Sequence, residues 1–470
     1  MLNKIIILLL FQLSFNMMVF PFKLAKEHKN GLITEDSKEY NGSHFGADYF
    51  NAKIYFEMKI GDPIQPVKIL LTSDTCAFKI GKSKRCIYSD EYLSYYNRNK
   101  SNDFSYTPGY SVADQEFYNE KGCTALDTIY AYTDLKLEKE TKFRRVGFYL
   151  GSDTNDKLCG YIGLEFDNIL CEKMFNIVKH CKSKNYINNY KFMMKYNNIN
   201  EGLFIIGGEL KDVIDNYDER KNFVSKLSEE VTMNKWGVDV NKIILGDKNH
   251  TIEKEIPAQI NNDFTFIILD SKYLTHFNNS FFLEYFNKGI CKIALYDNNP
   301  EYKYLEKYNV IECDKDKFGE NDLKKFPILY IYVADYYKEK KLNFDGKDLF
   351  TETKYKYFFN IIFDLSPRNK IELGKIFLQK YTVNFNIDNK MLEIYDYQDY
   401  NDEKGEDEES FFSKNKIIFY IIIIVILFAI TGVVGYFLGK YLNNLRKKRA
   451  NELVDDEYVY NPETKEPINQ

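Results

Sequence analysis

The sequence predicts a mainly β fold, and three observations carry this prediction. Short segments rich in β-branched and aromatic residues, separated by polar turns, run through residues 49–397. Hydrophobic residues make up 44% of the 470-residue chain and aromatic residues 16%, which is ample for a packed core. An apolar strand that ends in a cluster of small polar residues occurs twice, which indicates two related halves.

The predicted strands follow one another along the chain with few helices between them. The clearest are YFEMKIGD, PVKILL, CTALDTIYAYT, FRRVGFYL, LFIIGG, KIILGD, FTFIILDS, PILYIYV, FFNIIFD and YTVNFNI. Gly246 and Asp247 separate two strands and are typical of a tight hairpin. A helix is expected within CEKMFNIVKHCKSK, residues 171–184.

Charge and motif content exclude several classes of function. The formal net charge is −5, and no basic stripe interleaved with aromatic residues suggests nucleic-acid binding. The five histidines are scattered, and the sequence lacks the HExxH and GxSxG motifs. We therefore expect neither a metal nor another cofactor.

Both ends of the chain carry membrane signals. Residues 1–21 resemble a signal peptide cleaved near residues 20–25, with an uncleaved anchor as the alternative. Residues 416–439 carry no internal charge and are long enough to span a bilayer as a helix. An acidic stalk, residues 398–415, precedes this helix, and a basic segment opens the tail, residues 440–470. The positive-inside rule then predicts a single-pass type I membrane protein with a lumenal or extracellular ectodomain and a cytoplasmic tail.

The repeated pattern links segments that lie far apart in the chain. KILLTSDTCAFKI, residues 68–80, is echoed by FTFIILDSKYLTHF, residues 264–277. Each segment is followed about a hundred residues later by an apolar residue and a glycine, at 162–163 and 373–374. The pattern indicates two copies of one half-site.

Six ordered landmarks resemble a pepsin-family aspartic protease. They are IGDPIQPVKILL, GCTALDTIYA, CGYIGLEF, LFIIGGEL, KWGVDVNKIILGD and GKIFLQKYTVNFNIDNKMLEIYDY. With the predicted anchor, the chain is most similar to the membrane-bound plasmepsin and memapsin branches. The resemblance implies a bilobal fold with an interlobe cleft, an N-terminal lobe over residues 49–225 and a C-terminal lobe over residues 226–397. Residues 22–48 are then a short linker or a vestigial pro-segment.

The first catalytic loop departs from the pattern of this family. Catalysis needs two aspartates, one from a D-[ST]-G loop in each lobe, which share one proton across a bound water. Thr72, Ser73 and Asp74 stand at the three positions of the first loop, so a threonine replaces the first aspartate. A hydroxyl is too weak an acid to form a proton-sharing pair.

The second catalytic loop is expected at Asp270 and Ser271, where the glycine has become Lys272. In this alignment Asp270 is the remaining catalytic aspartate, and Ser73 and Ser271 tie the two loops together. An active alternative pairs Asp270 with Asp74, which lies two residues beyond the expected place. Two tyrosines, Tyr106 and Tyr118, are candidates for the flap that covers the cleft in this family.

All eight cysteines lie in the predicted ectodomain, and an even number in an oxidising compartment favours disulfides. Relatives often close a loop in the second lobe where Cys291 and Cys313 stand, so these two are the first predicted pair. The predicted local closures are Cys76–Cys86 and Cys171–Cys181.

Three functions follow from the resemblance. The first is a membrane-anchored pseudoprotease that binds a peptide or protein partner in its cleft. The second is an active endopeptidase of the secretory pathway or cell surface that uses Asp270 with Asp74. The third is an adhesin or assembly subunit that does not use the cleft. Gly435 and Gly439 form a GxxxG pair that allows the predicted membrane helix to form a homodimer or to bind a membrane-protein partner.

Overall fold

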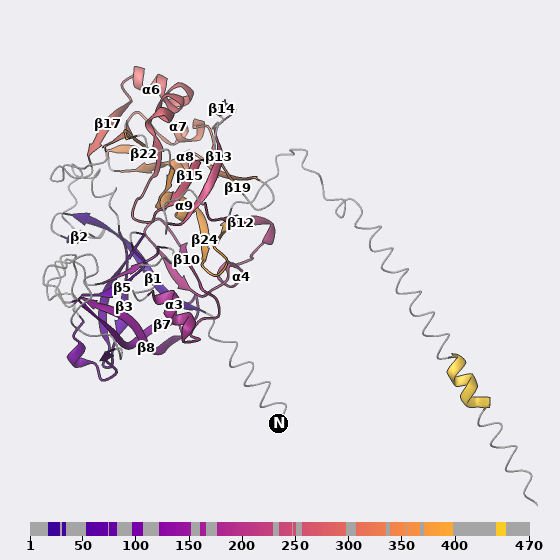
Figure 1. The fold of residues 1–470 in the computed structure, drawn as a ribbon. Helices are drawn as coiled ribbons and strands as arrows, with labels where there is room; N and C mark the ends of the chain where they lie inside the picture. The colour runs from indigo at the N-terminus through magenta and orange to yellow at the C-terminus, as the bar shows by residue number, and fades with distance from the viewer. Residues whose placement is uncertain are drawn as a thin grey trace, which may run out of the picture. The chain divides into compact units, whose positions relative to one another are not determined.

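A computed structural model describes most of the predicted ectodomain and a short C-terminal stretch. The described residues are 17–28, 31–33, 53–73, 75–81, 96–106, 122–151, 160–165, 176–228, 235–246, 248–250, 256–297, 307–334, 339–353, 355–366, 371–397 and 439–447. The chain divides into a compact unit, Met1–Tyr397, and a second unit, Gln398–Gln470. The first unit contains two large β-sheets (Figure 1), which confirms the predicted mainly β, two-lobed fold.

The first sheet has 14 strands. In spatial order they are β12 (Asn222–Lys226), β25 (Met391–Asp396), β24 (Tyr381–Asn386), β10 (Lys191–Tyr196), β11 (Glu201–Ile206), β1 (Met18–His28), β3 (Lys53–Ile60), β4 (Gln65–Thr72), β9 (Gly160–Gly163), β5 (Phe78–Ile80), β8 (Glu140–Gly151), β7 (Gly122–Tyr132) and β6 (Ser105–Tyr106), with β2 (Gly31–Ile33) beside β1.

The second sheet has 11 strands. In spatial order they are β17 (Cys291–Asp297), β18 (Lys307–Asp314), β22 (Lys356–Asp364), β16 (Ile267–Asp270), β23 (Ile371–Leu373), β15 (Ile256–Ile260), β13 (Gly237–Leu245), β19 (Leu329–Ala334) and β20 (Glu339–Phe344), with β14 (Lys248–His250) beside β13 and β21 (Phe350–Glu352) beside β22. The turn between Leu245 and Lys248 is the predicted hairpin.

Short helices join the strands. They are α3 (Ile177–Ser183), α4 (Leu210–Val213), α5 (Leu274–Phe277), α6 (Leu283–Asn287), α7 (Glu320–Lys325), α8 (Gly346–Leu349) and α9 (Lys375–Lys380). The helix predicted within residues 171–184 is α3, whose N-cap Asn176 accepts a hydrogen bond from the Lys179 amide at 3.1 Å.

The two sheets repeat one arrangement of strands. In the first, β4 runs parallel to β9, β9 antiparallel to β5, and β5 parallel to β8. In the second, β15 runs parallel to β23, β23 antiparallel to β16, and β16 parallel to β22. This order makes β15 the counterpart of β4 and β16 the counterpart of β5.

The two predicted lobes share the first sheet. Strands β24 and β25 belong by sequence to the predicted C-terminal lobe, yet β24 pairs with β10 and β25 with β12. Figure 1 shows β24, in orange, beside β10, in magenta. Phe192 of β10 stacks on Phe385 of β24 with a centroid distance of 4.6 Å, and Trp236 packs edge-on against Phe385. The hydrophobic core is therefore continuous across the two halves.

The N-terminal strand changes the interpretation of the predicted signal peptide. β1 pairs with β11 from Met18 to Lys23 and with β3 from Lys23 to Ala25. Met18 and Phe20 are buried in the core. The predicted boundary after residue 21 thus lies inside a central strand, and cleavage there would remove core side chains.

One predicted disulfide is present and another is excluded. Cys291 and Cys313 face each other on β17 and β18 and are bonded, as predicted. Cys181 is a free thiol, fully buried in the apolar core, so the predicted Cys171–Cys181 bridge is wrong. Cys76 is disulfide-bonded, whereas Cys86 lies outside the described residues.

Within the part of the chain that the structure describes, no helix is long and apolar enough to cross a membrane. The predicted span, residues 416–439, lies outside the described residues except for Gly439.

Candidate functional site

The first loop of the site follows β4 and begins at Thr72. Thr72 stands beside Gly163 in the parallel pairing of β4 with β9, and the Leu164 amide donates to the Thr72 carbonyl at 2.8 Å. A Cβ atom at Gly163 would lie 2.0 Å from the Thr75 carbonyl oxygen. The predicted glycine is therefore required because the loop backbone passes directly over it.

A second loop with the same surroundings follows β15 and consists of Asn261, Asn262 and Asp263. The Asn261 amide donates to the Leu373 carbonyl at 3.0 Å, and a Cβ atom at Gly374 would lie 2.3 Å from the Phe266 carbonyl oxygen. Gly374 thus holds this loop as Gly163 holds the first. By strand position, Asn261 corresponds to Thr72 and Asn262 to Ser73.

Ser73 and Asn262 brace the two loops against each other. The Asn262 amide donates to Ser73 Oγ at 3.0 Å, and Asn262 Nδ2 donates to the Leu71 carbonyl at 3.1 Å. The Ser73 hydroxyl also donates to Asn262 Oδ1. Ser73 therefore lies in the bracing position expected for it, but its partner is Asn262 and not the predicted Ser271.

Asp270 and Ser271 lie elsewhere, at the end of β16 and after it, away from the braced loops. Ile267 at the start of β16 is level with Leu373, beside the end of β15. From there β16 runs away from the loops, so Asp270 lies about 10 Å further along the strand. Its carboxylate accepts the Lys272 amide at 2.9 Å and caps the short 3₁₀ helix Ser271–Tyr273. Lys272 lies in this 3₁₀ helix and not in the loop that bonds Ser73.

Thr72, which the resemblance places at the first catalytic position, and Asn261, its counterpart by strand position, end β4 and follow β15. Neither side chain has a carboxyl group, so these two positions cannot share a proton as an aspartate pair does. Asp74, the other predicted candidate, lies outside the described residues.

A different carboxylate, that of Asp263, lies at the junction of the loops. Asp263 Oδ2 accepts hydrogen bonds from Thr72 Oγ1 at 3.0 Å and from the Ser73 amide at 2.7 Å. Lys53 Nζ lies 3.4 Å from Asp263 Oδ1, and the Asp263 side chain is 6% exposed. We call Asp263 with Thr72, Ser73 and Lys53 the junction clasp. Its carboxylate accepts hydrogen bonds from donors on the opposite loop.

Further polar contacts surround the clasp. Asn261 Nδ2 donates to the buried carboxylate of Glu372 at 3.2 Å. Lys235 Nζ pairs with Glu165 at 2.7 Å and donates to the Ser73 carbonyl. Trp236 Nε1 donates to the Leu164 carbonyl at 2.6 Å. These bonds connect the two halves at several points around the loops.

Lys375 lies beneath the same junction as the first residue of α9. Its side chain is completely buried, and its Nζ has no hydrogen-bond partner among the described residues. Burial, and to a lesser extent the charge of Lys53, lower the pKa of Lys375 to about 7, and the charge of Asp263 opposes this shift. Sequence patterns alone gave no signal for this residue, because its burial depends on contacts with segments far away in the chain.

Of the two flap candidates, the structure describes Tyr106. It belongs to β6, pairs with Ala125 of β7, and its exposed ring packs edge-on against Phe104 at a centroid distance of 5.1 Å. The Arg98 guanidinium donates to the Tyr106 hydroxyl. Tyr118 lies outside the described residues.

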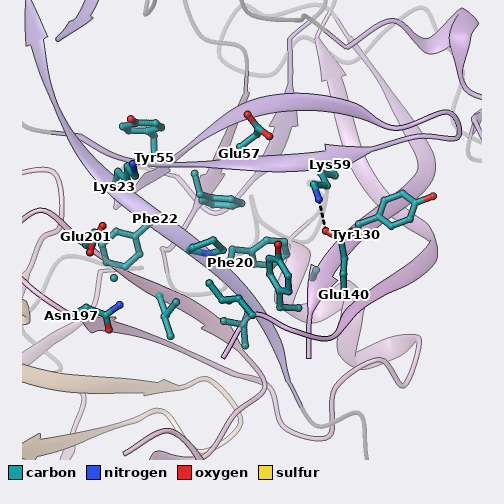
Figure 2. Close-up of a pocket in the computed structure, with 18 of the residues that line it drawn as sticks. Phe20, Phe22, Lys23, Tyr55, Glu57, Lys59, Tyr130, Glu140, Asn197 and Glu201 are labelled. Carbon is teal, nitrogen blue, oxygen red and sulfur yellow. Dashed lines mark hydrogen bonds and ion pairs between the residues drawn. The ribbon is translucent and has the colours of Figure 1, made fainter. Parts of the chain in front are cut away.

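A separate cavity of about 600 Å³ lies over β1, away from the two loops. Most of its lining residues belong to β1, β3, β7 and β11. On the N-terminal side of Lys23, β1 no longer pairs with β3, and it pairs with β7 at Val19. Figure 2 shows Lys59 paired with Glu140, at 2.7 Å, on one side and Glu201 on the other. None of the junction residues lines this cavity.

The described residues contain no group of three or more histidine, cysteine, aspartate or glutamate side chains arranged to hold a metal ion. The side chains at the junction bind one another through hydrogen bonds and ion pairs.

Comparison with known proteins identifies the fold. No family model matches the chain, and no curated protein matches its sequence. The crystal structure of basic 7S globulin from soybean, a protein of pepsin-like fold, is similar, with a TM-score of 0.51 and 11% sequence identity. The match covers 81% of this chain and 95% of that chain. The chain therefore has the pepsin-like fold.

Proposed function

We propose that this chain is a membrane-anchored, pepsin-like pseudoprotease of the plasmepsin and memapsin type that binds a peptide or protein partner between its lobes. One observation supports the proposed loss of protease activity. The facing loop ends present Thr72 and Asn261, and the nearby Asp263 carboxylate is bonded to the opposite loop. Without a proton-sharing pair, no group at the junction can both activate water and polarise a peptide carbonyl.

Partner binding does not need the lost carboxylates. Extended peptides pair with exposed strand backbone through main-chain hydrogen bonds, while pockets for alternate side chains provide specificity. The braces between Ser73 and Asn262 keep the loops in place although the catalytic residues are gone. Two loops that are hydrogen-bonded to each other but carry no aspartate pair support a binding role rather than a hydrolytic one.

The active alternative pairs Asp270 with Asp74. The position of Asp270, about 10 Å along β16 from the braced loops, argues against this pair. The adhesin or assembly alternative differs only in the surface that the partner uses, so a binding test distinguishes it from the proposal.

The test of activity uses the full chain in detergent and a diverse peptide library at about pH 4 to 7, the range in which carboxylate pairs function. We expect no turnover. Turnover that is lost in Asp74→Asn or Asp263→Asn would overturn the pseudoprotease proposal.

The test of binding identifies partners by cross-linking the full chain in its membrane. Thr72→Tyr places a bulky ring at the loop junction, and Glu57→Ala changes the separate cavity over β1. We expect Thr72→Tyr to weaken partner capture and Glu57→Ala to leave it unchanged. Capture that is insensitive to Thr72→Tyr would support an adhesin or assembly surface elsewhere.

A further inference from the structure

The backbone fixes Lys375 firmly in place. The Lys375 amide donates to the Phe264 carbonyl at 2.9 Å, and the next amide, of Ile376, donates to the Thr265 carbonyl at 3.0 Å. The segment that follows Asp263 therefore wraps around the first turn of α9. Lys375 is thus joined through its backbone to the segment that carries Asp263.

The buried amine of Lys375 has no hydrogen-bond acceptor among the described residues. An ammonium group in an apolar interior is costly unless a carboxylate or other acceptor is hydrogen-bonded to it. Lys375 Nζ has no hydrogen-bond partner among the described residues, and the carboxylate whose charge acts on it is that of Asp263. The amine therefore has no acceptor of its own within the described part of the chain, and its backbone is bonded to Phe264, the residue that directly follows Asp263.

Other charged groups on the elements packed against α9 have their own partners. Lys191 of β10 pairs with Glu209 and Glu393, at 2.8 and 3.0 Å. Asp348 of α8 pairs with Lys380 at the far end of α9. On β23, Glu372 accepts from Asn261. Asp263, in contrast, has a loosely held oxygen, since its Oδ1 lies 3.4 Å from Lys53.

We propose that Lys375 and Asp263 form a proton-controlled switch of the junction clasp. With Lys375 neutral, the Asp263 carboxylate bonds Thr72 and Ser73 and ties the two loops together. When Lys375 binds a proton, its ammonium group draws the carboxylate toward α9 and weakens these two bonds. The clasp is then closed at mildly alkaline pH and loosened at mildly acidic pH. This switch goes beyond the proposed function, and it does not depend on whether a partner binds.

The fluorescence of the single tryptophan can report the loosening of the junction clasp. Trp236 is the single tryptophan, it is buried, and its indole donates to the Leu164 carbonyl across the junction. Its neighbour Lys235 donates to the carbonyl of Ser73. Movement of the first loop therefore changes the surroundings of the indole ring and shifts its fluorescence.

The experiment follows Trp236 emission of the full chain in detergent from about pH 8.5 to about pH 5.5, with circular dichroism to verify folding. We expect a reversible shift with a midpoint near the pKa of Lys375, about 7. Lys375→Met, whose unbranched side chain is one atom shorter and cannot bind a proton, should abolish the shift. The matched control Lys380→Met, on the same helix, should retain it.

Two results would overturn the switch: a folded wild type without the shift, or a shift that persists in Lys375→Met. If Lys375→Met does not fold, the same titration of the Asp263→Asn variant tests the proposed switch. This variant removes the charge that the ammonium group attracts, so we expect one emission spectrum across the pH range. A titration in Asp263→Asn equal to that of the wild type would contradict the proposal. Titration of a histidine cannot imitate the result, because all five histidines of the chain are present in every variant.

Discussion

Asp263 accepts a hydrogen bond from the Thr72 hydroxyl, with 3.0 Å between Oδ2 and Oγ1. The same oxygen accepts the Ser73 amide at 2.7 Å. A carboxylate of the second loop thus accepts hydrogen bonds from donors of the first loop. The contact is a structural one between the two loops, and the first two predictions depend on this junction.

Restoring the first aspartate should damage the junction without restoring activity. Thr72→Asp places a second carboxylate against Asp263, and like charges at this distance cannot both ionise cheaply. We expect no peptide hydrolysis and a loss of about 1–3 kcal/mol in the free energy of unfolding at neutral pH, measured by urea denaturation. Thr72→Asn, which is neutral and can still donate, should lose less. Hydrolysis by Thr72→Asp alone would contradict the prediction.

The brace between the loops predicts different effects for two serines. Ser73→Ala leaves the buried amide of Asn262 without its acceptor, which should cost about 1–3 kcal/mol in the free energy of unfolding. Ser271→Ala changes a residue of the short 3₁₀ helix, outside the brace, and should stay within about 0.5 kcal/mol of wild type. Equal losses in the two variants would contradict the observed pairing of the loops.

The sequence was sufficient to predict the mainly β fold, but it did not indicate that Asn262 and Asp263 would bond the loop of Thr72 and Ser73. The first loop follows a well-matched strand, and its partner Gly163 was identified from the apolar–glycine pattern. The loop that bonds Ser73, Asn261–Asp263, does not begin with an aspartate, whereas the segment of Asp270 and Ser271 does. Residue type was therefore misleading. The available signal was strand order, since the strand that follows the Trp236 hairpin is β15 and not β16.

Other features depend on long-range contacts that local patterns do not contain. Lys375 reads as a surface lysine at the start of a helix, and its burial arises only when Phe264 and Thr265 pack over α9. The apolar residues near the N-terminus match a signal peptide, yet their last members form β1. A hydrophobic segment satisfies both interpretations, and only the pairing with β11 and β3 distinguishes them.

Lys375 should also make overall stability depend on pH. Its folded pKa, about 7, lies below its ordinary value of 10.5, so the unfolded chain binds more protons between these values and stability rises with pH across this window. Below about pH 7 both states are protonated, and the penalty is constant. From about pH 6 to 9 the wild type should gain about 2–3 kcal/mol from this residue. Lys375→Met should lack this gain, which urea unfolding at the two pH values measures; an unchanged pH slope in Lys375→Met would contradict it.

The last prediction concerns the N-terminus of the mature protein. Met18, Val19 and Phe20 are almost completely buried, and burial of such side chains is worth about 1.5–3 kcal/mol each. Their removal would cost a large part of the roughly 5–15 kcal/mol by which a typical domain is stable. We therefore expect N-terminal sequencing of the protein from membranes to find Met18–Phe20 retained. Two truncations behind a foreign signal sequence test the reason: a chain that starts at Met17 should accumulate and unfold cooperatively, whereas one that starts at Phe22 should not. A natural chain that begins between residues 21 and 25 and unfolds at the same urea concentration as the longer one would show that β1 is dispensable.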